Sequence, residues 1–245
     1  MKPTERFTER AGDYAIGRPS YPDASIDALF ESFPDPSHLT VIDLGAGTGI
    51  SSRLLAARGA QVIAVEPNAA MAAKSERIAN LRWQIATAER TGLPSASADI
   101  VAAFQAFHWF EHPATIAEML RLLRPGGRAA VIYNERDERD PFTAAYGAIV
   151  RRYATEDTEQ LRANARAAFE HDRAWAALHA VTAGHAHRLD RAGLHARVRS
   201  TSYLPHDGAV RAQLHTDVDA LYDEYAVNGI VTMHMTATTT IGSHT

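Results

Sequence analysis

The chain has 245 residues, of which 46% are hydrophobic and 22% charged, and these proportions exclude disordered, collagen-like and coiled-coil chains. The net charge of −4 argues against a general nucleic-acid binder, and the absence of cysteine excludes disulfides and thiolate metal sites. No apolar run reaches the roughly 20 residues of a membrane span, and the first residues lack the apolar stretch of a secretory signal. We therefore expect a cytoplasmic protein with a single domain over residues 1–245.

The first 37 residues are polar and rich in proline, and we interpret residues 1–37 as a cap segment with a short helix over 24–32. Apolar strands then alternate with helices. The predicted strands span 38–44, 61–65, 81–86, 100–104 and 128–133, and the predicted helices span 50–58, 69–78 and 113–123. This alternation is typical of βαβ units, and it predicts an α/β fold with a mostly parallel sheet and helices on both faces.

The pattern changes after residue 136. Residues 137–196 are rich in Ala and Arg, with helical stretches near 142–154 and 158–177, and we expect a helical lid inserted between strands five and six. Beyond it, the pattern predicts a strand over 197–204, a helix over 209–227 and a strand over 230–241. The sheet then has seven strands.

Five of the twelve histidines lie close together in the sequence, at positions 171, 179, 185, 187 and 195. A histidine cluster suggests a metal site. However, no spacing such as H-E-x-x-H accompanies these residues, so we predict no metal.

A glycine-rich segment, Val-Ile-Asp-Leu-Gly-Ala-Gly-Thr-Gly over 41–49, lies where the first strand passes into a helix. Glycines at such a place allow a tight turn and a close approach of the backbone to a ligand. The dinucleotide pattern is G-x-G-x-x-G, but here the spacing is G-x-G-x-G and Ile50 occupies the third-glycine position. Asp43, at the strand tip, favours a ligand with an ammonium group over a phosphate.

Glu66 ends the second predicted strand, 21 residues after Gly45 (66 − 45). An acidic residue at this spacing and strand position accepts hydrogen bonds from the hydroxyls of a ribose. The alternative is a solvated loop glutamate. The spacing and the strand context together favour a nucleoside site.

Several segments, taken together, resemble the class I S-adenosylmethionine (SAM)-dependent methyltransferases, in particular a small-molecule subgroup that includes trans-aconitate methyltransferase-like proteins. The resemblance covers most of the chain and is weak over 137–196. The segments that carry it are the glycine-rich segment, 86–100, 104–110, 121–127, Tyr14 with 18–22, and 202–205.

The resemblance implies a Rossmann-like sheet with an antiparallel last strand, and SAM as the cofactor. The residues that it places under the amino-acid part of SAM are Asp43, Gly45, Ala46, Gly47, Thr48 and Gly49. The residues that it places around the ribose and adenine are Glu66, Pro67, Met71, Thr87, Ala88 and Glu89. Gln105, Ala106 and Phe107 would lie beside the methionine moiety. Tyr14 and Arg18 would cover the site, with Arg18 pairing the SAM carboxylate.

His108 is the candidate general base, because it follows the fourth strand at the carboxyl edge of the sheet, where ligands bind. Alternatively, it is a structural histidine that packs beside Trp109. A hydroxyl, carbon or nitrogen acceptor could use such a base, whereas a carboxylate or thiolate needs none. The aromatic residues expected to line the substrate site, or else to fill the core, are Trp109, Phe142, Tyr146 and Tyr203.

We therefore expect a SAM-dependent methyltransferase with a small-molecule acceptor and no nucleic-acid or membrane partner. An NAD(P)-dependent oxidoreductase on the same fold is disfavoured by the glycine spacing, and a non-catalytic SAM-binding protein stays open because a sequence does not show turnover. Nucleic-acid methylation is disfavoured because the chain reads Gln-Ala-Phe-His over 105–108, where an Asn/Asp-Pro-Pro-Tyr motif would stand. The acceptor atom and the oligomeric state also stay open.

Overall fold

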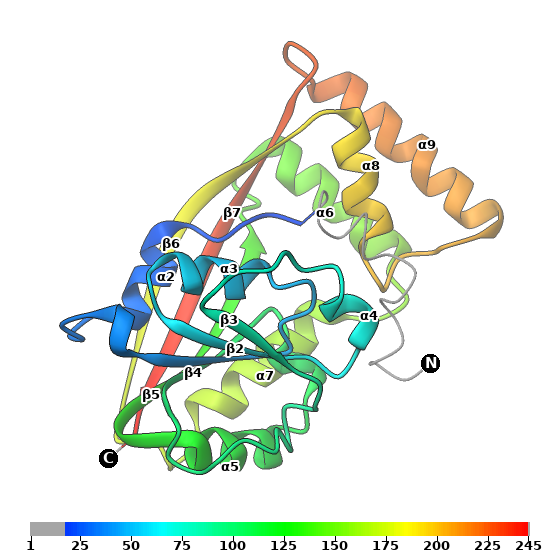
Figure 1. Cartoon of the computed structure of the whole chain (residues 1–245). Coiled ribbons are helices and arrows are strands. Elements are labelled where there is room, and N and C mark those ends of the chain that lie inside the picture. The colour runs from blue at the N-terminus through cyan, green and yellow to red at the C-terminus, as the bar shows by residue number, and fades with distance from the viewer. Residues whose placement is uncertain (1–17, 245) are drawn as a thin grey trace.

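The computed structural model describes residues 18–244, so Tyr14 lies outside the described residues. The described chain forms a seven-stranded sheet in the order β3-β2-β1-β4-β5-β7-β6 (Figure 1). The strands are β1 (Thr40–Leu44), β2 (Gln61–Val65), β3 (Leu81–Gln84), β4 (Ala98–Phe104), β5 (Leu123–Arg136), β6 (Ala177–Leu189) and β7 (Val231–Ser243). Strands β1 to β5 are parallel to one another, and β7 runs antiparallel to both of its neighbours. This arrangement confirms the predicted Rossmann-like sheet with an antiparallel last strand.

The central strands are apolar because both of their faces are buried. Alternate residues of a strand point to opposite faces, so neighbouring residues enter different cores. In β1, Val41 packs in one hydrophobic cluster and Ile42 in another, and both are fully buried. The continuous run of Val, Ile and Ala in β2 and β4 has the same cause.

Helices cover both faces of the sheet (Figure 1). On one face lie α2 (Asp23–Phe30) and α3 (Ile50–Ala57), and on the other lie α5 (His112–Leu122) and α7 (Thr158–Glu170). A third cluster joins the end of β6 and the start of β7 to three more helices, α6 (Pro141–Tyr153), α8 (Arg191–Arg199) and α9 (Gly208–Tyr225). The short helices are η3 (Pro36–His38), α4 (Ala69–Ala72) and η4 (Phe107–Trp109). Over residues 18–244, no helix combines the length and the apolar character that a membrane span needs.

The structure corrects the prediction in two places. The helical insertion expected over 137–196 contains α6 and α7, but its second half holds β6, and the strand expected over 197–204 is replaced by α8 and a turn. The Ala-rich β6 has a helical composition, but it pairs with β7 along its whole length, from Ala177 opposite Ser243 to Leu189 opposite Val231. Such tertiary pairing overrides intrinsic propensity. The predicted helix over 69–78 is also shorter, because α4 ends at Ala72.

Helix α8 begins at a capping residue that the prediction did not use. The Asp190 side chain accepts a hydrogen bond from the Gly193 N–H at 2.7 Å. This bond satisfies one of the amide groups that the first turn of a helix leaves without a partner.

Replacing Asp190 with Ala should lower the free energy of unfolding by about 1 kcal/mol, because the capping bond is lost. Urea unfolding followed by circular dichroism measures this change. Asp207→Ala is the matched control, since Asp207 precedes α9 and its side chain makes no capping bond. Equal destabilisation by the two substitutions would contradict the capping role of Asp190.

Candidate functional site

The glycine-rich segment forms a loop between β1 and α3 that only glycine can build without strain. Gly45, Gly47 and Gly49 have φ angles of 69°, 60° and 80°, in the left-handed region. A Cβ on Gly45 would lie 2.7 Å from the Cβ of Ala106, and a Cβ on Gly47 would project toward Met71, 3.5 Å from its Cε. The loop therefore brings bare backbone to the carboxyl edge of the sheet.

Glu66, at the end of β2, holds this loop. Its Oε2 accepts a hydrogen bond from the Gly47 N–H at 2.9 Å, and its Oε1 accepts one from the Asn68 N–H at 2.9 Å. Burial raises the pKa of Glu66, and the two backbone donors partly offset that rise. Each carboxylate oxygen keeps a lone pair for a ligand.

Asp43 lies behind the loop. Its Oδ2 accepts hydrogen bonds from the hydroxyls of Ser51 and Ser52 on α3, at 2.7 and 2.6 Å. Its Oδ1 is buried and makes no hydrogen bond with the described residues. Burial raises the pKa of Asp43 to about 6, against the effect of the two serine hydroxyls. A buried carboxylate oxygen without a donor is costly, so this site favours a ligand that brings one.

A cavity of about 190 Å³ opens at the ends of β1, β2 and β4, and we call it the glycine-loop cavity. Its lining residues are Gly45, Gly47, Glu66, Pro67, Met71, Thr87, Ala88, Glu89, Phe104, Gln105, Ala106, Trp109 and Phe110. All of these except Phe104, Trp109 and Phe110 are residues for which we predicted a cofactor contact. The predicted cofactor residues come from four segments of the sequence, and the fold places these segments around one cavity.

Some predicted cofactor residues lie elsewhere. Asp43, Thr48 and Gly49 support the loop from behind and do not line the glycine-loop cavity. Phe107 is fully buried and stacks on the His112 ring, with 4.9 Å between ring centroids. A small cavity of about 50 Å³ on the other side of the loop is lined by Ala46 and Arg18, among others.

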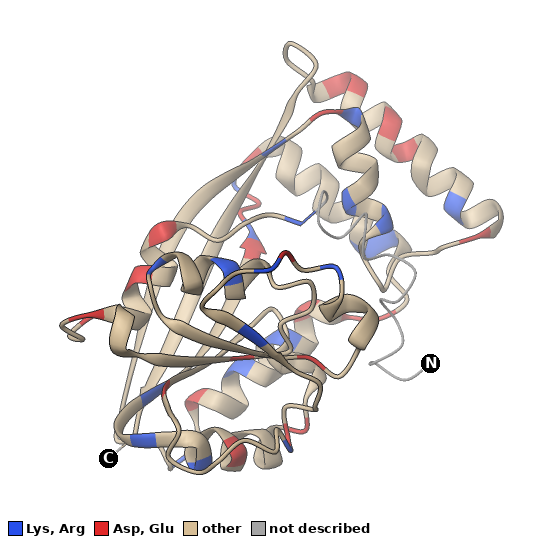
Figure 2. Cartoon of the chain, in the orientation of Figure 1, with Lys and Arg blue, Asp and Glu red and all other residues tan. Residues whose placement is uncertain are grey.

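A second cavity, of about 70 Å³, adjoins the first, and Gln105 and Trp109 line both. We call it the arginine cavity. Its lining residues are Arg18, Gln105, His108, Trp109, Asn134, Glu135, Arg136, Tyr146, Val150, Arg162, Arg197, Thr201, Ser202, Tyr203 and Met235. The helices that supply Arg162 and Arg197 are α7 and α8, and Figure 2 shows basic segments on both of them.

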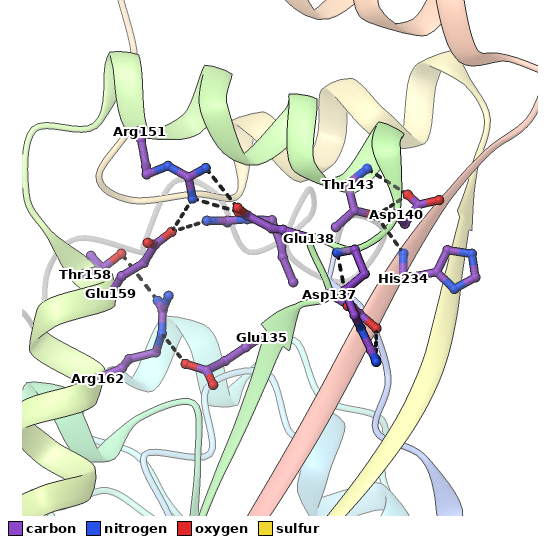
Figure 3. A network of polar contacts seen from close by, with 12 residues as sticks. Glu135, Asp137, Glu138, Asp140, Thr143, Arg151, Thr158, Glu159, Arg162 and His234 are labelled. Carbon is purple, nitrogen blue, oxygen red and sulfur yellow. Dashed lines mark hydrogen bonds and ion pairs between the residues drawn. The ribbon is translucent and has the colours of Figure 1, made fainter.

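The four arginines of this cavity are held by different contacts. Arg18 donates to the Ser200 carbonyl at 3.0 Å, and the Arg197 guanidinium lies 6.0 Å from the centre of the Tyr146 ring. Arg162 reaches the Thr158 hydroxyl at 3.3 Å and the Glu135 carboxylate at 3.9 Å (Figure 3).

Arg136 is fixed by a ring of charges. It pairs with Glu138 and Glu159, and both carboxylates also contact Arg151 on α6 (Figure 3). These ion pairs join the end of β5 to the helices α6 and α7. Among the described residues that line the arginine cavity, Glu135 alone is acidic, and it also pairs with Arg166 at 2.9 Å. The cavity wall therefore carries an excess of positive charge.

The titratable groups of the cavity respond to this charge. Burial lowers the pKa of Arg197, and the neighbouring cations Arg18 and Arg136 lower it further, against the effect of Tyr146. Burial raises the pKa of Tyr203, but Arg162 and the other polar neighbours outweigh burial, so the net pKa is lowered. The lowered pKa of Tyr203 indicates a positive potential, whereas burial is the main cause of the lowered pKa of Arg197.

His108 lies on η4 and lines the arginine cavity, with its ring centroid 4.5 Å from that of Trp109. Burial lowers its pKa to about 3, and Arg162 and Arg18 lower it in the same direction. His108 is therefore neutral at pH 7. Its Nδ1 is buried and, like the Nε of Arg162, makes no hydrogen bond with the part of the chain that the structure describes.

The predicted substrate residues divide into two groups. Trp109, Tyr146 and Tyr203 line the arginine cavity. Phe142 lines neither the glycine-loop cavity nor the arginine cavity, and it packs in the core of α6, α8 and α9, with its ring centroid 5.9 Å from that of Tyr225.

Sequence reasoning missed most of the arginine cavity. Arg136, Arg162 and Arg197 lie on β5, α7 and α8, and nothing in their local sequence distinguishes them in a chain whose basic residues are nearly all arginine. The position of Arg136 at the carboxyl end of a strand, where ligands bind in such sheets, was the one feature of the sequence that could have indicated a site residue. Within residues 18–244, no group of three or more His, Asp or Glu side chains has the geometry to hold a metal ion.

Comparison with known proteins points to one enzyme class. Residues 42–131 match a family model described as a methyltransferase domain. An uncharacterized methyltransferase of Mycobacterium tuberculosis is 40% identical over 151 residues, which cover 60% of this chain and 59% of that protein. The trans-aconitate 2-methyltransferase of Deinococcus radiodurans is 34% identical over 117 residues, which cover 46% of this chain and 43% of that enzyme. The matched region thus spans less than two thirds of either relative.

Solved structures share the fold over nearly the whole chain. A proposed type II methyltransferase from Anaeromyxobacter dehalogenans superposes with a TM-score of 0.64 at 24% identity, over 93% of this chain and 97% of that one. Phosphoethanolamine N-methyltransferase 2 of Haemonchus contortus, solved with SAM, gives a TM-score of 0.54 at 15% identity, over 100% of this chain and 59% of that one.

The relatives and the solved structures reported above are all named as methyltransferases. Residues 42–131 of this chain are thus similar to a methyltransferase domain, and the chain shares its fold with solved methyltransferases.

Proposed function

We propose that the chain transfers a methyl group from SAM, bound in the glycine-loop cavity, to a small anionic acceptor bound in the arginine cavity. The observation that carries this proposal is the shared wall. Gln105 and Trp109 line both cavities, so ligands in the two cavities would meet there. The residues present fit a cationic nucleoside in one cavity and an anion in the other.

The fit to SAM rests on the loop and on two carboxylates. Gly45 and Gly47 leave room for the cofactor where a Cβ would intrude, and Glu66 offers both oxygens to the ribose hydroxyls. Pro67 and Met71 supply an apolar wall for the adenine. Asp43, buried behind the loop, would act on the SAM ammonium through its negative charge or through a water molecule, and its Oδ1 otherwise lacks a donor among the described residues.

SAM supplies a methyl group on a sulfonium sulfur, which leaves with the bonding electron pair when the acceptor attacks. The chain itself aligns donor and acceptor and excludes water. The helices α6 and α7 act as the lid over the arginine cavity, and the charge ring around Arg136 holds both of them against β5. Arg18 lies at the other side of the cavity, where it donates a hydrogen bond to the Ser200 carbonyl.

The acceptor is a carboxylate. Four arginines face one glutamate in the cavity wall, and guanidinium groups bind carboxylates through paired hydrogen bonds. The trans-aconitate in the name of one relative is itself a carboxylate. A carboxylate needs no base, so neutral His108 serves as a hydrogen-bonding residue for the acceptor. With a hydroxyl acceptor, His108 would take the proton instead.

Glu66→Ala should weaken the binding of S-adenosylhomocysteine (SAH) by about 2–3 kcal/mol, or roughly 30- to 160-fold, because both ribose bonds are lost. Titration calorimetry measures this change. Glu76→Ala, on the exposed turn after α4, is the control and should bind as the wild type does. Unchanged affinity in the Glu66 variant would reject the ribose assignment.

The affinity for SAH should rise about tenfold from pH 5 to pH 7, because Asp43, with a pKa of about 6, holds a proton at the lower pH and attracts the ammonium only when ionised. SAH binding displaces the proton from Asp43, because the bound ammonium lowers the pKa of this carboxyl below its value in the free chain. The affinity therefore rises as the pH rises through the pKa of the free chain. Asp43→Asn should remove the pH dependence in the same calorimetric series. A variant that keeps the wild-type pH profile would show that another group titrates.

The acceptor assignment is tested with small mono-, di- and tricarboxylates, trans-aconitate among them, and with neutral alcohols and amines as comparators. We expect SAM-dependent mass gain of one CH₂ only on the carboxylates. Arg162→Gln should then raise the acceptor KM about tenfold to a hundredfold, because a charge-assisted bond is lost. Arg139→Gln, which removes an exposed arginine paired with Asp137, is the control. Methylation of the neutral compounds alone would overturn the anionic acceptor.

A further inference from the structure

Gln105 occupies a backbone conformation that costs energy. It follows β4 with a φ of 51°, and such a left-handed conformation costs a non-glycine residue about 1–3 kcal/mol. Four non-glycine residues in the described part of the chain have positive φ, and of these only Gln105 lines one of the three cavities described above. A glycine would remove the strain, so the side chain must contribute something that glycine cannot.

The Gln105 side chain makes hydrogen bonds to β5 beyond the point where the backbone pairing of β4 with β5 ends. Regular pairing of β4 with β5 ends at Phe104 and Ile132, after which the Gln105 N–H still donates to the Ile132 carbonyl at 2.8 Å. The side-chain amide then takes over. Its Nε2 donates to the Asn134 carbonyl at 3.1 Å, and its Oε1 accepts from the Asn134 N–H at 3.0 Å. The amide thus imitates a peptide group of a neighbouring strand.

Asn134, the partner of this amide, is itself fixed on two sides. Its Nδ2 donates to the Ser20 carbonyl at 3.0 Å, and its Oδ1 lies 2.7 Å from the Nε2 of His185 on β6. Asn134 is 5% exposed and pairs with Ala237 of β7. The Gln105 side chain is therefore attached to a rigid part of the sheet.

Gln105 forms a partition between the cavities. It lines the glycine-loop cavity, the arginine cavity and the small cavity behind the loop. Because the side chain is tied to Asn134, the strained backbone is held where the three cavities meet. A displacement of this wall would change the alignment of the two ligands without removing a contact that either needs for binding.

We propose that Gln105 is a positioning residue for methyl transfer, whose side-chain amide holds the wall between the donor and acceptor cavities in a strained conformation. This inference rests on the proposed function. Alignment affects the transfer step itself, and a misplacement of about 1 Å costs on the order of 100-fold in rate. The amide bonds to Asn134 therefore support the rate of transfer more than the affinity for either ligand.

The test compares Gln105→Gly, which relieves the strain and removes the amide, with Gln105→Glu, which keeps an oxygen for the Asn134 N–H and loses the Nε2 donor. The Gly variant should reduce the single-turnover rate about 100-fold, with the SAH Kd and the acceptor KM nearly unchanged. Hydrogen exchange of the Asn134 amide should be faster in the Gly variant and remain slow in the Glu variant, whose transfer rate should be intermediate. The acceptor used is the one that the carboxylate panel identifies.

Ala96→Gly is the matched control, because Ala96 has a φ of 50° and is exposed outside all three cavities. This variant should transfer at the wild-type rate. Wild-type transfer by Gln105→Gly, or a loss that falls entirely on the SAH Kd, would overturn the positioning role. A wild-type chain that methylates no member of the panel would overturn the proposed function, and this inference with it, before any variant is made.

Discussion

The hydrogen bond from the Gly47 N–H to the Glu66 carboxylate is the contact on which the site depends. It joins the loop after β1 to the end of β2, and it forms because parallel strands present their carboxyl ends at one edge of the sheet. It adds to the hydrogen bonds that the Gly45 and Ala46 N–H groups donate to the Val65 carbonyl, and it gives the buried Glu66 carboxylate a second backbone donor beside Asn68. Gly47 and Glu66 both line the glycine-loop cavity, and the carboxylate oxygens of Glu66 keep lone pairs for a ligand there.

Charge is distributed unevenly across the shared wall. The glycine-loop side holds the carboxylates of Glu66 and Asp43, and the far side holds the arginines. A cationic donor and an anionic acceptor would each meet the opposite sign, and methyl transfer would remove one positive charge from the donor and one negative charge from the acceptor. The charge pattern thus suits a reaction in which a positive group passes to a negative one, and release of the neutralised pair is favoured.

The sequence predicts those parts of the molecule whose structure is determined by residues close together in the chain or at a fixed spacing. The strand over 61–65 is a continuous apolar run because both of its faces are buried, and the loop and Glu66 follow from fixed spacings on adjacent strands. β6 escaped prediction because it is a partly exposed edge strand whose structure comes from β7. The arginine cavity escaped for a related reason, since Arg162 and Arg197 meet only through tertiary packing.

The position of β7 between β5 and β6 has a consequence for how the chain matures during synthesis. β7 follows β5 and β6 in the chain, yet β5 and β6 do not pair with each other and both pair with β7. Until it inserts, the sheet ends at an open β5 edge, a configuration that invites association with other nascent chains. This side of the sheet therefore closes only once β7 has been synthesised, and β5 waits for a partner strand that lies far along the chain.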